Sequence, residues 1–155
     1  MSKIREVLRY FTLQYPYKDE LSKARLTKMV YLADWYSSKE NGRQITKIKW
    51  YFDHYGPYVS DVYEEANKDK YLNIKQTYTM FGSPKEVIEF KYKNDLVPKL
   101  SLDKDEIKIL DKVINETKQL TWNAFIDKVY STYPIQKQNR YTTLNLIRLA
   151  KEENN

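Results

Sequence analysis

Apolar residues recur at helical spacing along most of this chain, and a single segment of β-forming residues interrupts the pattern. The interruption covers residues 72–93, where β-branched and aromatic residues flank the turn-forming sequence FGSPK. The helical stripes lie at residues 3–14, 22–41, 58–69, 103–118, 121–132 and 143–152. This order predicts an α+β fold that is predominantly helical, with about six helices and one small antiparallel β-hairpin.

Capping residues predict where several of these helices begin and end. Ser22 and Thr121 are expected N-caps, and Asp103 with Glu106 matches a capping box. Gly42 is expected to end the second helix in a left-handed conformation. Ser2 is expected to cap the first helix, and Pro57 is expected in the first turn of the third. A linker is expected over residues 94–101. The fifth helix should stop at Tyr133-Pro134, and its inward-pointing residues should be Trp122, Phe125, Ile126 and Val129.

The length of 155 residues predicts one domain with a single core. We expect residues 1–150 to form this globular domain and residues 151–155 to be a frayed tail. The start of the chain has no apolar stretch of signal-peptide length, and no window reaches the length of a membrane span. Together with the absence of cysteine, this predicts a cytoplasmic protein without membrane contact.

The composition also argues against the common catalytic sites. One histidine and no cysteine leave no recognised ligand spacing, so no metal site is predicted. Three glycines cannot supply a dinucleotide fingerprint or a phosphate-binding loop, so no cofactor is predicted. We therefore expect a binding protein and no enzyme; a small enzyme that uses His54 as a general base stays as a minor alternative.

Three segments in the middle of the chain form an ordered pattern: residues 26–34 read LTKMVYLAD, residues 41–46 read NGRQIT, and residues 55–60 read YGPYVS before Val62-Tyr63. With these segments the chain resembles the Panacea (SocA-like) antitoxin domain. A lysine-bearing apolar helix, a polar turn, a Gly-Pro segment and a further helix follow one another in the same order in that family. Thr132-Tyr-Pro134 also resembles its C-terminal element.

The resemblance implies an antitoxin of a bacterial or phage toxin–antitoxin pair, which neutralises a cognate protein toxin by direct contact. It also implies an alternative in which the domain is an adaptor that delivers the toxin to a protease, so a protease or chaperone is a further expected partner. Neither mechanism requires catalysis by this chain.

The densest aromatic segment is the predicted toxin-facing patch, because interfaces draw on aromatic residues. Its predicted binding residues are Trp50, Tyr51, Phe52, His54, Tyr55 and Tyr58. Packing in the core is the competing interpretation for each of these rings. Gly56 and Pro57 are expected to shape the chain, and a homodimer that uses the same rings stays open.

A winged-helix-like DNA-binding regulator is the alternative of a different class. Two helices, a Gly-Pro-led third helix and a hairpin with lysines at 75, 85, 91 and 93 suit such a fold. The net charge of +6 would attract DNA weakly. Asp61, Glu64, Glu65 and Asp69 make residues 58–69 acidic on balance, however, which would repel phosphates where a recognition helix should attract them.

Overall fold

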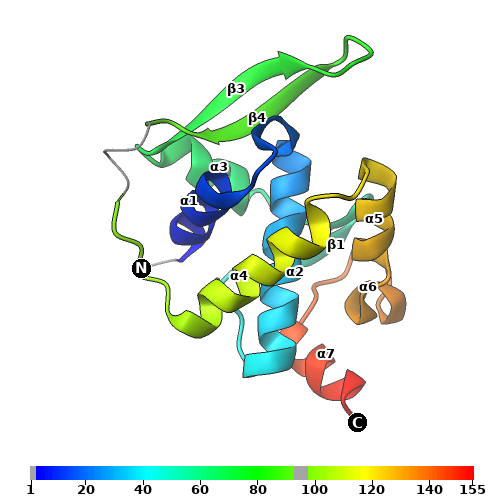
Figure 1. Ribbon diagram of the computed structural model, residues 1–155. Helices are drawn as coiled ribbons and strands as arrows, with labels where there is room; N and C mark the ends of the chain where they lie inside the picture. The colour runs from blue at the N-terminus through cyan, green and yellow to red at the C-terminus, as the bar shows by residue number, and fades with distance from the viewer. Residues whose placement is uncertain (1–2, 93–97) are drawn as a thin grey trace.

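Helix α2 (Lys23–Asn41) passes through the middle of the molecule, and the other elements surround it (Figure 1). The computed structural model describes residues 3–92 and 98–155. Residues 25–35 of α2 are buried without interruption, so this helix is covered on all sides. Its neighbours are α1 (Ile4–Gln14), α3 (Asp61–Lys68), α4 (Lys104–Thr117), α7 (Leu146–Glu153), β2 (Gly56–Tyr58) and β4 (Pro84–Phe90).

The remaining elements are the 3-10 helix η1 (Lys18–Glu20), the strands β1 (Tyr51–Asp53) and β3 (Leu72–Tyr78), and the helices α5 (Trp122–Tyr130) and α6 (Tyr133–Lys137). The described residues thus form seven α-helices and two small antiparallel sheets of two strands each. The prediction of a predominantly helical α+β fold is confirmed.

Capping explains several helix ends. The Ser22 hydroxyl accepts from the Arg25 N–H at 3.1 Å, and Thr121 accepts from the Ala124 N–H at 3.2 Å. Both hydrogen bonds of the Asp103–Glu106 capping box are present at the start of α4. Gly42 ends α2 with φ at +71°. Ser2 and the first part of the predicted linker lie outside the described residues, as does Lys93.

A second hairpin, β1–β2, was not predicted, and the placement of Pro57 in a helix is wrong. Pro57 lies in β2 opposite Phe52, and α3 begins only at Asp61. The N–H of Phe52 donates to the Thr142 carbonyl at 2.9 Å, and the Phe52 carbonyl accepts from the Tyr141 N–H. Phe52 therefore directs its backbone hydrogen bonds to the C-terminal segment, and the missing N–H of Pro57 costs this sheet nothing.

The predicted hairpin at residues 72–93 is confirmed as β3–β4. Its strands pair from Leu72 opposite Phe90 to Tyr78 opposite Pro84, and residues 79–83 form the turn. Leu72, Val87 and Ile88 are buried near its base, where the Ile88 N–H donates to the Leu21 carbonyl at 2.9 Å. The far end of the hairpin projects away from the helices (Figure 1).

The C-terminal third differs from the sequence prediction in detail. The chain forms α6 at Tyr133-Pro134, because proline suits the first turn of a helix as well as the end of one. Helix α7 begins at Leu146, where the Asn145 side chain accepts from the Arg148 N–H at 3.1 Å, since Thr143 is paired with Tyr51 in a β-bridge. It continues to Glu153, into the segment expected to fray.

Candidate partner-binding surface

Two adjoining pockets lie on either side of Ala24 and Trp122. The hairpin pocket, about 730 Å³, is bounded by η1, the start of α2, the hairpin β3–β4 and the start of α5. The tyrosine pocket, about 560 Å³, lies between α2, the β1–β2 hairpin and α5. Its lining residues are Ala24, Lys28, Asp53, His54, Tyr55, Tyr58, Trp122, Ile126 and Tyr130.

Helical spacing builds two walls of the tyrosine pocket. Ala24 and Lys28 are four residues apart on α2, and Trp122, Ile126 and Tyr130 follow one another at the same spacing on α5. The prediction that Trp122 points inward is wrong, because its side chain is 45% exposed, whereas Phe125 is buried and Ile126 is partly buried against the core as predicted. Helix α5 thus has one face in the core and one face in the pocket.

Gly56 allows Tyr130 to approach the β1–β2 hairpin closely. Its φ is +101°, and a Cβ atom added there would lie 2.9 Å from Cε1 of Tyr130. A side chain at this position would be strained and would also displace the ring. The predicted shaping role of Gly56 therefore has a physical basis in the wall of the pocket.

Lys28 is a buried cation without a fixed partner. Its side chain lines the tyrosine pocket, yet the residue is only 4% exposed. No hydrogen bond or ion pair joins its ammonium group to any residue in the described ranges. Burial lowers the pKa of Lys28, and the negative charge of Asp53 opposes this shift.

Two of the predicted binding residues are in the core. Trp50 is fully buried and Phe52 is 4% exposed, so the expectation that they are exposed is wrong. The Trp50 indole packs edge-on against Tyr31 at 5.5 Å between ring centroids, and its N–H donates to Asp34 at 2.8 Å. The burial follows from packing against α2, which the sequence could not reveal for one ring among many.

Asp34 holds the segment after α2 in place. Its carboxylate accepts from the backbone N–H groups of Ile45 and Thr46, both at 2.9 Å, as well as from the Trp50 indole. The Thr46 hydroxyl and the Gln44 amide also donate to it. Asp34 is completely buried. Because buried polar groups must be satisfied, this network fixes the path from Gly42 to Trp50.

The other predicted residues lie at or beside the tyrosine pocket. His54, Tyr55 and Tyr58 line it, while Tyr51 is half-buried and bridges to Thr143. Tyr55 is 76% exposed and meets the His54 ring edge-on at 4.5 Å. His54 Nδ1 lies 3.1 Å from the Tyr141 hydroxyl. Three of the six predicted residues are thus brought together in one pocket.

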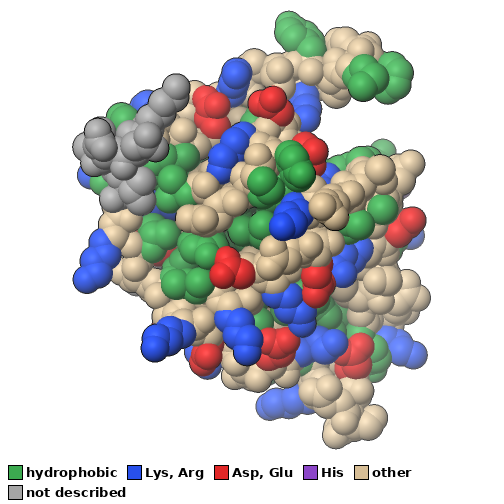
Figure 2. Space-filling model, in the orientation of Figure 1, with side chains coloured by type: hydrophobic (Ala, Val, Ile, Leu, Met, Phe, Trp, Pro, Cys, Tyr) green, Lys and Arg blue, Asp and Glu red, His purple; other side chains and the backbone are tan. Residues whose placement is uncertain are grey.

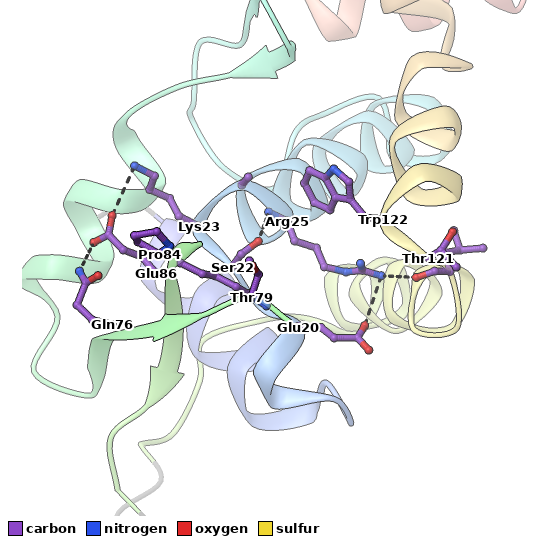
Figure 3. A pocket seen from close by; sticks show the side chains of 13 residues that line it. Glu20, Ser22, Lys23, Arg25, Gln76, Thr79, Pro84, Glu86, Thr121 and Trp122 are labelled. Carbon is purple, nitrogen blue, oxygen red and sulfur yellow. Dashed lines mark hydrogen bonds and ion pairs between the residues drawn. The ribbon is translucent and has the colours of Figure 1, made fainter. Parts of the chain in front are cut away.

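The hairpin pocket contains charged groups that already have partners. Figure 3 shows Lys23, Gln76 and Glu86 on one side of this pocket and Arg25 with Trp122 on the other. Lys23 lies 3.9 Å from Glu86. The buried Arg25 guanidinium donates to the carbonyls of Thr117 and Leu120 at 2.9 and 3.1 Å, which joins α2 to the α4–α5 corner. Arg25 therefore has a structural role.

The tip of the hairpin β3–β4 exposes apolar side chains beyond the hairpin pocket. Met80 and Phe81 are 94% and 91% exposed, and Tyr78 is 72% exposed. In Figure 2 hydrophobic side chains cap the end of this hairpin, which stands clear of the rest of the molecule. Exposed large apolar groups gathered in one place are typical of interaction sites.

Sequence reasoning did not identify Lys28, Trp122, Ile126, Tyr130 or the hairpin tip as parts of this surface. The spacing of four between Trp122, Ile126 and Tyr130 was the available signal for a second face on α5. A lysine within the apolar run 26–33 was the signal for Lys28. Both signals are equally compatible with core packing and with side chains that reach solvent.

Other kinds of site are absent from the part of the chain that the structure describes. Within residues 3–92 and 98–155, no three His, Cys, Asp or Glu side chains gather as metal ligands would. No helix in the same ranges combines the length and the apolar character needed to cross a membrane.

Comparison with known proteins agrees with the resemblance seen in the sequence. No curated protein and no solved structure matches the chain significantly. A family model described as antitoxin SocA-like, Panacea domain, matches residues 26–134, which include most of α2, both hairpins, α3, α4 and α5. Since the match covers more than half of the sequence, the chain belongs to the SocA-like antitoxin family with the Panacea domain.

Proposed function

We propose that this protein is the antitoxin of a toxin–antitoxin pair and that it neutralises its toxin by direct binding. Family membership supports an antitoxin role and a non-catalytic one. The observation that carries direct binding is the tyrosine pocket beside the hairpin pocket and the exposed hairpin tip. We infer that these features act as one surface, which we call the aromatic surface: Tyr55 and Trp122 line the tyrosine pocket, and Phe81 is exposed at the hairpin tip.

The chemistry of the aromatic surface suits a protein partner. Tyrosine and tryptophan supply most of the binding energy in many interfaces, because they bury a large area with few rotatable bonds. Tyr55 and Trp122 are well exposed in the free protein, so a partner can cover them. Their backbone positions lie in a hairpin and a helix, so little ordering is needed on binding.

The DNA-binding alternative has weaker support from the geometry. Helix α3 would be the recognition helix, yet its Glu65 binds Arg5 at 2.6 Å. Asp69, just after the helix, binds Arg9 at 2.7 Å. These pairs fix α3 against α1 and use arginines that phosphates would otherwise attract. The Asp61 and Glu64 carboxylates add further negative charge to the same helix.

Co-expression tests the proposal. Each small open reading frame beside the gene would be expressed alone and with this protein, scoring growth and then co-purification. We expect one neighbour to be toxic alone, and to be rescued in a stable complex. The double variant Tyr55→Ala, Trp122→Ala should fold and lose rescue, whereas Tyr92→Ser, which removes a ring at the base of the hairpin, should retain it.

The outcomes separate the mechanisms. Rescue with disappearance of the toxin would indicate the adaptor mechanism and a protease as a further partner. Rescue without any complex, or the absence of a toxic neighbour, would contradict neutralisation by contact.

A further inference from the structure

Lys28 is a largely buried residue whose ammonium group lines the tyrosine pocket and is not used by the fold itself. The residue as a whole is only 4% exposed, but its ammonium nitrogen is not among the buried polar atoms that lack a hydrogen-bond partner, so it keeps contact with the open space of the pocket. The aliphatic part of Lys28 packs within α2, but its charged end has no hydrogen-bond or ion-pair partner in the described ranges, and the side chain lines the tyrosine pocket. The ammonium group of Lys28 therefore faces whatever enters the pocket, beside the Asp53 carboxylate.

Asp53 lines the same pocket, and its negative charge acts on Lys28 without forming an ion pair with it. One oxygen of its carboxylate accepts from the backbone N–H of His54 at 2.8 Å, and this hydrogen bond stabilises the β1–β2 turn. Among the described residues no contact short enough for an ion pair joins it to Lys28, so the two charges interact only over a longer distance. Its presence limits the ligand, because a group with two negative charges would meet Asp53 as well as Lys28. A single negative charge fits this pair better than a phosphate does.

The other walls of the tyrosine pocket indicate which kind of apolar group carries the negative charge of the ligand. Tyr55, Trp122, Ile126 and Tyr130 present aromatic and aliphatic surface around the opening. An apolar stem would lie against these side chains, and only its end would need a charged partner. This arrangement matches a short side chain with a terminal carboxylate.

We propose that the tyrosine pocket binds the carboxylate of an aspartate or glutamate side chain of the toxin, with Lys28 as the opposite charge and Tyr55 and Trp122 against the stem. This inference rests on the proposed antitoxin function and names the chemistry recognised at its surface. The basic side chains of the hairpin pocket are weaker candidates, because Lys23 faces Glu86 and Lys85 donates to the Asp19 carbonyl at 2.9 Å.

A small probe tests the pocket without the toxin. The protein would be titrated with 3-phenylpropionate and with its uncharged amide, following the indole N–H signal of Trp122 by NMR. We expect the carboxylate to bind at least tenfold more tightly than the amide. Lys28→Met should abolish this preference and keep the fold, since a buried charge is replaced by an apolar chain of similar length. Lys39→Met, near the other end of α2 and outside both pockets, is the control and should retain the preference.

The affinity for the toxin is the second test of the inference. Lys28→Met should weaken toxin binding tenfold or more, whereas Lys39→Met should change it less than threefold. Equal binding of the two probes by the wild type would overturn the inference, as would an unchanged toxin affinity in Lys28→Met, and either result leaves the antitoxin proposal standing. If the wild type neutralises no neighbour, the antitoxin proposal fails, and with it the assignment of a toxin carboxylate to the pocket.

Discussion

Asp34 joins the segment 26–34 to the segment 41–46, both of which resemble the family, through its hydrogen bonds with Ile45 and Thr46. The buried environment of its carboxyl group makes the stability of the fold depend on pH. Burial raises the pKa of Asp34 from 3.8 to about 6, although its hydrogen bonds act to lower it. The folded protein therefore retains a proton that the unfolded chain has lost. Asp34 contributes stability that is fully present below about pH 4 and is lost as the pH rises through about 6, a change of about 3 kcal/mol.

Chemical unfolding between pH 4 and pH 7 checks this expectation by comparing the wild type with Asp34→Asn. The free energy of unfolding of the wild type should fall relative to that of the variant as the pH rises through this range. Burial acts to raise the pKa of Asp69, but the hydrogen bond from Arg9 makes the net shift downward, and this group titrates in both proteins. Parallel pH profiles would contradict the assignment to Asp34.

Gly56 and Gly42 allow a backbone effect to be separated from a packing effect. Both have positive φ, but a Cβ atom meets the Tyr130 ring only at Gly56, while it finds open space at Gly42. We expect Gly42→Ala to cost about 1 kcal/mol and Gly56→Ala to cost about 3 kcal/mol in unfolding free energy. Denaturant titration measures both values, and equal costs would mean that Tyr130 moves aside freely.

At the level of the elements, the hairpin β3–β4 should act in binding without contributing its tip to stability. Met80 and Phe81 are almost completely exposed, so Met80→Ser with Phe81→Ser should change the unfolding free energy by less than about 0.5 kcal/mol. The same double variant should weaken the toxin complex about tenfold or more, because two large apolar side chains are lost from the aromatic surface. Calorimetry of unfolding and of binding measures both effects, and undiminished affinity would exclude the tip from the interface.

The elements differ in how far the sequence could predict them. Helices α1, α2, α4 and α5 were predicted because each has an apolar stripe, and a local cap marks the start of the last three. The β1–β2 hairpin depends on the segment around Tyr141, almost ninety residues further along, and no local pattern reports that pairing. For the same reason the sequence located the aromatic segment of the site but could not separate the buried Trp50 from the exposed Tyr55.

For the whole molecule, the charge distribution predicts how binding responds to salt. Basic and acidic side chains alternate over the face drawn in Figure 2. We expect the affinity for the toxin to fall less than about tenfold between 50 and 200 mM salt, because an aromatic interface loses little to screening. A DNA complex with about six phosphate contacts would lose about a thousandfold over the same range. Binding measurements with both partners distinguish the two functions, and a steep loss of toxin affinity would contradict an interface centred on aromatic rings.

The contrast between the Asp34 network and the hairpin tip also determines where the chain can change length. Residues 43–46 lead from Gly42 to the backbone N–H groups of Ile45 and Thr46, which both donate to the buried Asp34 carboxylate. One extra residue in this segment would move these donors away from the carboxylate. Within the described part of the chain, the hydrogen bonds of the turn at residues 79–83 join only its own residues Thr79, Gly82 and Ser83. Longer loops cost little when their ends are already held together, and β3 and β4 hold these ends. A peptide epitope inserted between Phe81 and Gly82 should therefore be carried without disturbing the core, whereas the loop after α2 would accept no insertion.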